Sequence, residues 1–118
     1  MEPLAVHHVS INVTDTARSL AFYTEVLGGT QRTDRPREFG FGGAWIDLGA
    51  QQVHLIEAPV PPNQGQHFAI QVADLDAAVA ELRELGISVG DPSPVGTGRQ
   101  AFLDDPDGNA IELHQVAD

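Results

Sequence analysis

The chain contains one internal repeat, and each copy of the repeat begins with a histidine. The segment that starts at His8 aligns with the segment that starts at His67, 59 positions later. A second match pairs His54 with Glu112, 58 positions apart. In both copies an alternating apolar pattern leads into a helical one, so the chain is constrained to fold as two similar halves.

Each half is predicted to contain one helix and four strands in the order β-α-β-β-β. The first helix has Thr14 or Asp15 as its expected N-cap and Gly28 as its stop. In the first half we expect strands at residues 6–13, 30–33, 41–48 and 51–57 and a helix at 15–27. In the second half we expect strands at 66–72, 87–90, 99–103 and 109–116, a helix at 74–85, and a loop around Pro92, Pro94, Gly96 and Gly98.

The residues between the two halves form a Pro-rich connector. We interpret the chain as a single domain, 1–118, with module one at about 4–58, the connector at 59–65 and module two at 66–117. One helix packing on a four-stranded, mostly antiparallel sheet gives an α+β fold class. A single module cannot bury both faces of its sheet, so the second face requires the other module or a second chain.

Composition excludes several classes of function. The net charge of −11 and the absence of lysine argue against nucleic-acid binding. No apolar run is long enough for a membrane span and no secretory signal is evident, so we expect a cytoplasmic protein. Because the chain has no cysteine, any metal must be bound by histidine and carboxylate side chains.

Strand alternation places the candidate metal ligands on one kind of face. His8 shares a face with Ser10 and Asn12, opposite apolar neighbours, and His67, His54 and Glu112 are placed in the same way in their strands. All four can therefore line one concave surface. A lone histidine on a strand is more often structural, but ligand-capable residues at both repeated positions favour a divalent metal such as Zn, Ni, Fe, Mn or Co.

Two further histidines flank this set. His7 lies on the opposite face of its predicted strand and is expected to be structural. His114 shares the face of Glu112, where it is either a partner of that carboxylate or a residue at the rim.

Arginines and aromatic residues mark possible contacts to a ligand. Arg32, Arg35 and Arg37 lie in one loop and Arg99 lies in another; they bind an anionic group or merely offset nearby carboxylates. The aromatic residues Phe39, Phe41 and Trp45 are explained most simply by core packing, and alternatively as stacking surfaces for a ligand.

Two motifs carry a family resemblance that covers essentially the whole chain. The segment SLAFYTEVLG at 19–28 and the segment DPDGNAIEL at 105–113 resemble the vicinal oxygen chelate superfamily, which includes glyoxalases, extradiol dioxygenases, fosfomycin-resistance transferases and bleomycin-sequestering proteins. The resemblance implies paired βαβββ modules in a cup-shaped mixed sheet around a divalent metal. It also implies that His8, His54, His67 and Glu112 are the ligands and that the chain forms a homodimer.

The resemblance leads to two functional hypotheses. The first is a metal-dependent enzyme, a lyase, an isomerase or a dioxygenase, in which the metal chelates vicinal oxygens of a small substrate and stabilises an enolate or enediolate. Glu112 and His54 would then be catalytic, Arg37 or Arg99 would bind an anionic group, and Trp45 would contact the substrate. The second is a non-catalytic protein that sequesters an antibiotic or another small molecule. His54 stands where glyoxalase I usually has Glu or Gln, so no single activity of the family matches.

Overall fold

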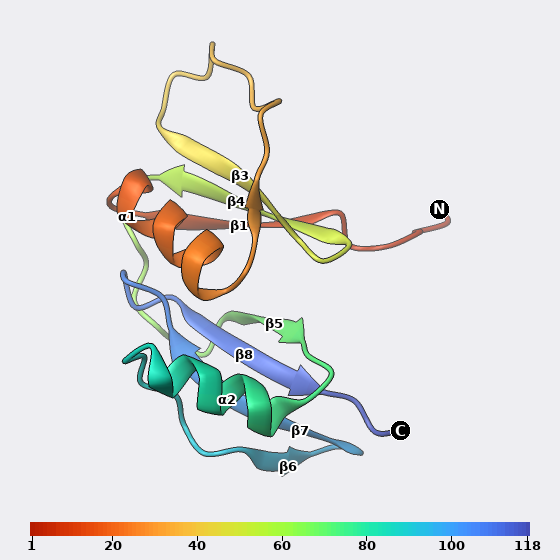
Figure 1. Cartoon of the computed structure of the whole chain (residues 1–118). Coiled ribbons are helices and arrows are strands. Elements are labelled where there is room, and N and C mark those ends of the chain that lie inside the picture. Colours follow the sequence, from red (N-terminus) through yellow and green to blue (C-terminus); the bar gives the residue numbers. More distant parts are fainter. The chain divides into compact units, whose positions relative to one another are not determined.

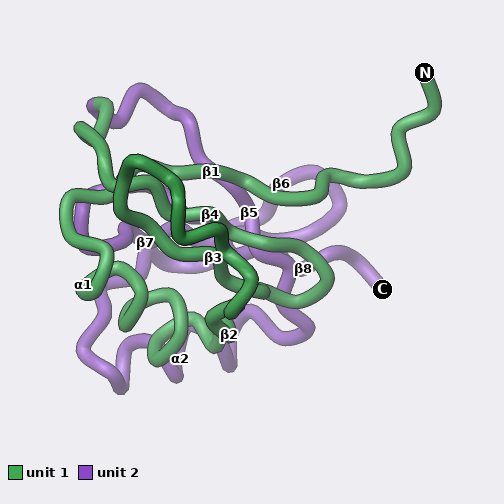
Figure 2. The backbone as a smooth tube through the Cα atoms, turned by 90° about the horizontal axis from the view of Figure 1, so that it is seen from above, with its two compact units in different colours: residues 1–61 green, residues 62–118 purple.

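The computed structural model describes all residues, 1–118, and the chain divides into two compact units, Met1–Pro61 and Pro62–Asp118 (Figure 2). The boundary lies inside the Pro-rich segment 59–65. No helix is long and apolar enough to cross a membrane.

Unit 1 is an open, mixed sheet with one helical segment (Figure 1). Its strands are ordered β1-β4-β3-β2; β1 pairs with β4 in parallel, and the other neighbours are antiparallel. The elements are β1 (His8–Val13), α1 (Thr16–Ala21), η1 (Phe22–Val26), β2 (Thr30–Gln31), β3 (Gly43–Leu48) and β4 (Gln51–Glu57).

Unit 2 repeats this topology. Its strand order is β5-β8-β7-β6, again with a parallel pair at one side, β5 and β8, and antiparallel neighbours elsewhere. The elements are β5 (His67–Gln71), α2 (Leu75–Glu84), β6 (Ser93–Val95), β7 (Gly98–Asp104) and β8 (Ala110–Gln115). The predicted α+β class and the βαβββ order are therefore confirmed in each half.

Each helix packs on one face of its own sheet and leaves the other face to the polar residues. In unit 1, α1 lies against β3 and β4, and in unit 2, α2 lies against β7 and β8. The largest fully buried side chains are apolar or aromatic, apart from one serine: Tyr23, Ile46, Leu55, Leu75, Ile111, Val13 and Ser19. Burial of this apolar face stabilises each unit and fixes which way the alternating polar side chains point.

The two helices begin in the same way. Asp15 caps α1 by accepting the backbone N–H of Arg18, and Asp74 caps α2 by accepting that of Ala77. The first helical N–H is also bound by the last residue of the strand that pairs in parallel with the first strand: Glu57 Oε1 accepts from Thr16, and Gln115 Oε1 accepts from Leu75, at 3.1 and 2.7 Å. The repeat thus extends to the helix starts.

The first helix changes its hydrogen-bonding pattern halfway along. The predicted helix at 15–27 is present, but Phe22–Val26 is a π-helix. Thr24 Oγ1 donates to the carbonyl of Leu20 at 2.8 Å, a side-chain bond of the kind that widens a helical turn. Gly28, with φ of 80°, then ends the helix as predicted.

One predicted strand was wrong. Residues 87–90 contribute only an isolated bridge between Val89 and Leu103. The remaining strand of the sheet is instead β6, Ser93–Val95, in the segment that we predicted as a loop because of its prolines and glycines. Proline lacks an N–H, but β6 pairs only with β7, so it is an edge strand in which the missing donor costs no ladder bond.

Candidate functional site

In unit 1, His8 and His54 lie next to each other on the face opposite α1. The parallel register sets His8 beside Gln52 and Ser10 beside His54, so these side chains share a face. The two imidazole rings stack with their centroids 3.9 Å apart and their planes at 13°. His54 is only 9% exposed. The pairing predicted from alternation is therefore present in unit 1.

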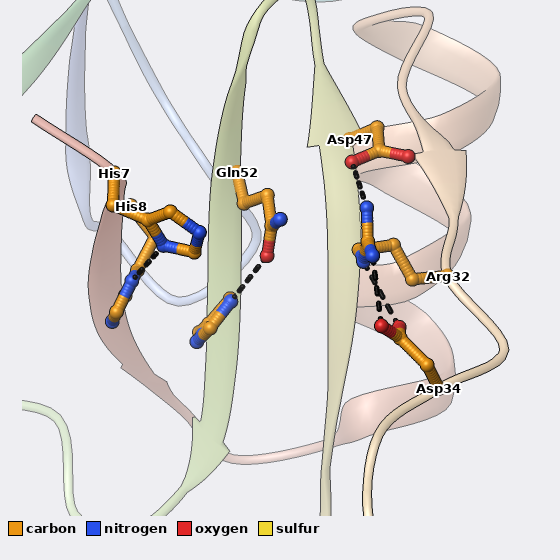
Figure 3. Close-up of polar contacts among 7 residues, drawn as sticks. His7, His8, Arg32, Asp34, Asp47 and Gln52 are labelled. Atoms are coloured by element: carbon orange, nitrogen blue, oxygen red, sulfur yellow. Dashed lines mark hydrogen bonds and ion pairs between the residues drawn. The ribbon is translucent and has the colours of Figure 1, made fainter. Parts of the chain in front are cut away.

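The hydrogen bonds of His54 leave one of its ring nitrogens available. Its Nε2 lies 2.8 Å from Gln52 Oε1 (Figure 3). An amide oxygen accepts only, so Nε2 carries the proton and Nδ1 has the free lone pair. Burial lowers the pKa of His54, and the neighbouring His8 and His7 lower it further, so the ring is neutral at pH 7.

His7 does not take the structural role predicted for it. The strand begins at His8, so alternation does not extend to His7, which is exposed. Its Nδ1 lies 2.9 Å from Nδ1 of His8, and the two rings meet edge to face at 5.1 Å (Figure 3). His7 is thus a neighbour of the candidate ligand rather than a residue of the opposite face.

In unit 2, His67 and Glu112 form the equivalent pair. Nε2 of His67 lies 3.1 Å from Glu112 Oε1. Nδ1 of His67 lies 2.9 Å from the carbonyl of Gly65 and donates to it. This bond to Gly65 and the adjacent carboxylate raise the pKa of His67 above its usual value. The ring therefore directs Nε2 at the carboxylate, with its other nitrogen held.

His114 holds the second oxygen of the same carboxylate. Its Nδ1 lies 2.8 Å from Glu112 Oε2, and the side chain of Glu112 is only 12% exposed. Of the two roles left open for His114, the contact supports a partner of Glu112. Although Glu112 contacts both imidazoles, the structure contains no group of three or more His, Asp or Glu side chains arranged to hold a metal ion.

An aromatic side chain also occupies the equivalent position in each half. Trp45 on β3 is in register with His54 and stacks on its ring at 4.4 Å. Phe102 on β7 is in register with Glu112, is 40% exposed, and meets the ring of His67 edge to face at 5.2 Å. The sequence prediction omitted Phe102, although its alternation with the buried Ala101 and Leu103 was the available signal.

Trp45, Phe39 and Phe41 do not form the core, which corrects our simplest explanation for these three residues. Trp45 lies on the face of His54, and Phe39 and Phe41 are 38% and 46% exposed. The reason is their placement: Trp45 alternates with the buried Ala44 and Ile46, and the two phenylalanines lie in the loop before β3.

The arginines differ in their partners. Arg32 contacts Asp34 and Asp47 at 2.7 and 2.9 Å (Figure 3), an interaction that lowers the pKa of Asp34. Arg99 forms two bonds of 3.0 Å to Asp76 on α2. Arg37 is exposed, and the guanidinium of Arg35 lies over two phenyl rings. Of the two arginines predicted to bind an anion, Arg99 therefore already has a carboxylate partner.

Known proteins similar to this chain identify its family. The family model described as the Glyoxalase/Bleomycin resistance protein/Dioxygenase superfamily matches residues 5–113. The uncharacterized protein YaeR of Escherichia coli is 34% identical over an alignment of 122 positions that covers 93% of this chain and 95% of YaeR. Lactoylglutathione lyase of Salmonella typhimurium is 32% identical over an alignment of 124 positions that covers 94% of this chain and 92% of the lyase.

A solved structure gives a second type of relative. TnmS3, an antibiotic binding protein from Streptomyces sp. CB03234, superimposes with a TM-score of 0.84 and 30% identity over 99% of both chains. Similar proteins thus include a lyase and a binding protein. The resemblance predicted from the two motifs is confirmed, and the chain belongs to the glyoxalase, bleomycin resistance protein and dioxygenase superfamily, the vicinal oxygen chelate proteins.

Proposed function

We propose that the chain is a metal-dependent enzyme of this superfamily, in which His8, His54, His67 and Glu112 bind one divalent metal ion. The substrate is a small molecule with vicinal oxygens, and the protein acts as a homodimer in the cytoplasm. The observation that carries the proposal is the repeated pair: each unit holds two ligand-capable side chains in contact, on its parallel strands and at matching positions.

The donor atoms fit a divalent metal. Three imidazoles and one carboxylate are the ligand types that first-row divalent ions prefer. A ligating histidine almost always donates its other N–H to a carbonyl, a carboxylate or water. His67 does so to the carbonyl of Gly65, and His54 bonds comparably to Gln52. The carboxylate of Glu112 favours a proton on Nε2 of His67. A metal ion bound to this nitrogen would take the place of that proton.

The residues have separate chemical tasks in this proposal. A bound divalent metal would polarise the substrate's vicinal oxygens and favour an enolate or enediolate. Glu112 is placed to move a proton at Oε1, because Oε2 is held by His114. His54 is neutral at pH 7 and is a fourth ligand or a base. Trp45 would contact the substrate, and Arg37 or Arg99 would bind an anionic group, Arg99 only by sharing or leaving Asp76.

Metal uptake is the first test of the proposal. The purified protein, stripped with chelator, is expected to bind one equivalent of Zn²⁺, Ni²⁺, Mn²⁺, Fe²⁺ or Co²⁺ and to gain thermal stability from it. His8→Ala, His67→Ala and Glu112→Gln should each reduce that gain. Asp91→Asn, a change at an exposed carboxylate of unit 2, is the matched control. A protein that takes up no metal, or variants that take it up unchanged, would overturn the proposal.

The reaction branch is then decided with the metal-loaded protein. Oxygen consumption with a catechol panel tests a dioxygenase. Incorporation of solvent deuterium into 2-hydroxyketones or acyl-CoA compounds tests proton transfer. Because one relative is a lactoylglutathione lyase, that activity is included in the panel. Metal uptake without any of these reactions would favour the second candidate below.

The second candidate is a binding protein that sequesters a small molecule without chemistry. Two observations favour it: the exposed aromatic residues of unit 1 and the similarity to an antibiotic binding protein. Such a protein would bind its ligand equally well with chelator present. An enzyme of the proposed kind would lose turnover under the same conditions.

A further inference from the structure

A continuous series of π systems extends from the candidate metal ligands of unit 1 to its largest loop. His8, His54 and Trp45 are stacked almost parallel, with successive ring centroids 3.9 and 4.4 Å apart. The ring of Phe39 follows at 6.1 Å from Trp45, and Phe41 stacks on Phe39 at 5.3 Å and 5°. We call the three outer rings, Trp45, Phe39 and Phe41, the aromatic platform.

The platform is exposed in a way that core packing does not explain. Phe39 and Phe41 keep 38% and 46% of their surface in contact with solvent, and Trp45 is partly exposed. Adjoining exposed aromatic rings beside a candidate site are typical of a surface that receives a ligand. Flat rings prefer flat partners in stacked or edge-to-face contact, so the platform favours a planar, unsaturated ligand.

Arg35 adds a positive charge at the outer end of the platform. Its guanidinium carbon lies 5.0 and 5.4 Å from the ring centres of Phe39 and Phe41, and Nη2 donates to the carbonyl of Phe41 at 2.9 Å. No carboxylate lies within ion-pair distance of Arg35, although the chain has 17 acidic residues against six arginines. By contrast Arg32, in the same loop, contacts two carboxylates.

We propose that the aromatic platform and Arg35 bind a planar aromatic anion, such as an aryl carboxylate or a phenolate. The aromatic part lies on the platform, and the anionic group takes the guanidinium N–H donors that Phe41 leaves free. This inference rests on the proposed function in one respect, since it names the substrate class of that same site. The platform and Arg35 belong to unit 1 and do not require the metal ligands of unit 2.

The single tryptophan provides a direct readout, because Trp45 is the only one in the chain. ¹⁵N-labelled protein in excess chelator is titrated with 2-naphthoate, 2-naphthamide and cyclohexanecarboxylate, and the indole N–H signal is followed. We expect 2-naphthoate to shift this signal saturably, with a Kd about tenfold or more below those of the neutral ring and the non-aromatic anion. Equal affinities for all three probes would overturn the inference.

Two variants separate the charge from the rings. Arg35→Gln should weaken 2-naphthoate about tenfold and leave 2-naphthamide unchanged. Phe39→Leu with Phe41→Leu should weaken both aromatic probes and leave cyclohexanecarboxylate unchanged. Arg83→Gln is the control, because that guanidinium is bound to Asp91 and to the Val89 carbonyl in unit 2. If Arg35→Gln binds 2-naphthoate as the parent does, the assignment of Arg35 is wrong.

The same samples distinguish failure of this inference from failure of the proposed function. Arg35→Gln is expected to take up metal like the parent protein. The double variant His67→Ala, Glu112→Gln is expected to lose metal and to keep binding 2-naphthoate. Loss of the naphthoate shift with metal uptake intact contradicts the aromatic-anion site alone. A naphthoate shift in a protein that takes up no metal contradicts the metal-dependent enzyme alone.

Discussion

Glu112 is oriented from two sides by imidazole rings. His67 contacts Oε1 and His114 contacts Oε2, at 3.1 and 2.8 Å. Both oxygens are thus held, Oε1 by a candidate ligand and Oε2 by a residue outside the proposed ligand set. Residues that hold a metal ligand by such a bond commonly change metal affinity about 10–100-fold when removed.

We therefore expect His114→Ala to weaken metal binding about 10–100-fold. His114→Asn should retain most of the affinity, because the amide nitrogen of asparagine occupies nearly the place of Nδ1 and can still donate to Glu112 Oε2. Isothermal titration with Zn²⁺ and with Mn²⁺ measures the difference. Equal losses in the two variants would show that the hydrogen bond to Glu112 is not what His114 contributes.

Two of the candidate ligands, His54 and His67, are expected to have pKa values on opposite sides of the ordinary histidine pKa of 6.5. Burial and the neighbouring histidines lower the pKa of His54, so the folded state binds fewer protons here than the unfolded state. The folded protein therefore loses stability as pH falls below about 6.5. The bond to Gly65 and the carboxylate of Glu112 raise the pKa of His67. Its contribution to the free energy of unfolding is therefore present at low pH and is lost as pH rises through the pKa of the folded state.

Imidazole NMR titration of the chelator-treated protein checks this order. The midpoint of His54 should lie below 6.5 and that of His67 above it. His54→Gln should also reduce the loss of stability between neutral and mildly acidic pH, measured by chemical denaturation. The reverse order of midpoints would contradict the contacts described for both rings.

Alternation along the strands was sufficient to place His8, His54, His67 and Glu112 on the faces they occupy. It could not identify their partners, because Gln52 and Gly65 reach the rings through side-chain rotamers and a loop carbonyl. It failed at His7, where the strand had not yet begun. The same alternation in β7 indicates Phe102, which is in register with Glu112.

At the scale of elements, the repeat includes a bond that joins each helix to its parallel strand. Glu57 in unit 1 and Gln115 in unit 2 each accept the first N–H of the helix of the same unit. These N–H groups have no partner within the helix itself, so a side chain that accepts one supplies the missing hydrogen bond. One acceptor is a carboxylate, which also accepts from the hydroxyl of Thr16, and the other is an amide.

We expect Gln115→Ala to lower the free energy of unfolding by about 1 kcal/mol, because the N–H of Leu75 loses its acceptor. Gln115→Glu, which copies the acceptor used in unit 1, should be as stable as the parent or slightly more so, since a negative charge is favourable at a helix N-terminus. Denaturant unfolding of the metal-free protein measures both. A similar loss in both variants would mean that the volume of the side chain matters and the bond does not.

Secondary structure followed the sequence where one signal dominated and departed from it where two signals competed. Asp15 and Asp74 are caps at both helices as residue type and position indicate. Pro94 indicated a loop, yet an edge strand tolerates it, and edge status depends on tertiary pairing that no local pattern contains. Thr24 lies in a segment with helical spacing, but its hydroxyl donates to the carbonyl of Leu20, and the segment is a π-helix there.

At the scale of the whole molecule, the duplication explains why the candidate ligands occur as two pairs. Each unit alone places two of them in contact, and two side chains leave a divalent ion with at least two coordination positions to be filled by water. If the four residues act as one set, neither pair is sufficient for tight binding. If unit 2 suffices, His114 would have to turn from its bond with Glu112 to complete a set with His67 and Glu112, because these three side chains are not arranged around a common point.

Removing one pair at a time decides between these possibilities. We expect His8→Ala with His54→Ala to weaken Zn²⁺ binding as severely as His67→Ala with Glu112→Gln, each by about 1,000-fold or more, since loss of a held ligand partner alone costs up to about 100-fold. His7→Ala should leave the affinity nearly unchanged, because His7 contacts His8 without belonging to the set. Full affinity in the first double variant would place the metal with His67, Glu112 and His114 and remove His8 and His54 from the ligands. The repeated histidine would then reflect the ancestry of the two halves rather than a shared metal.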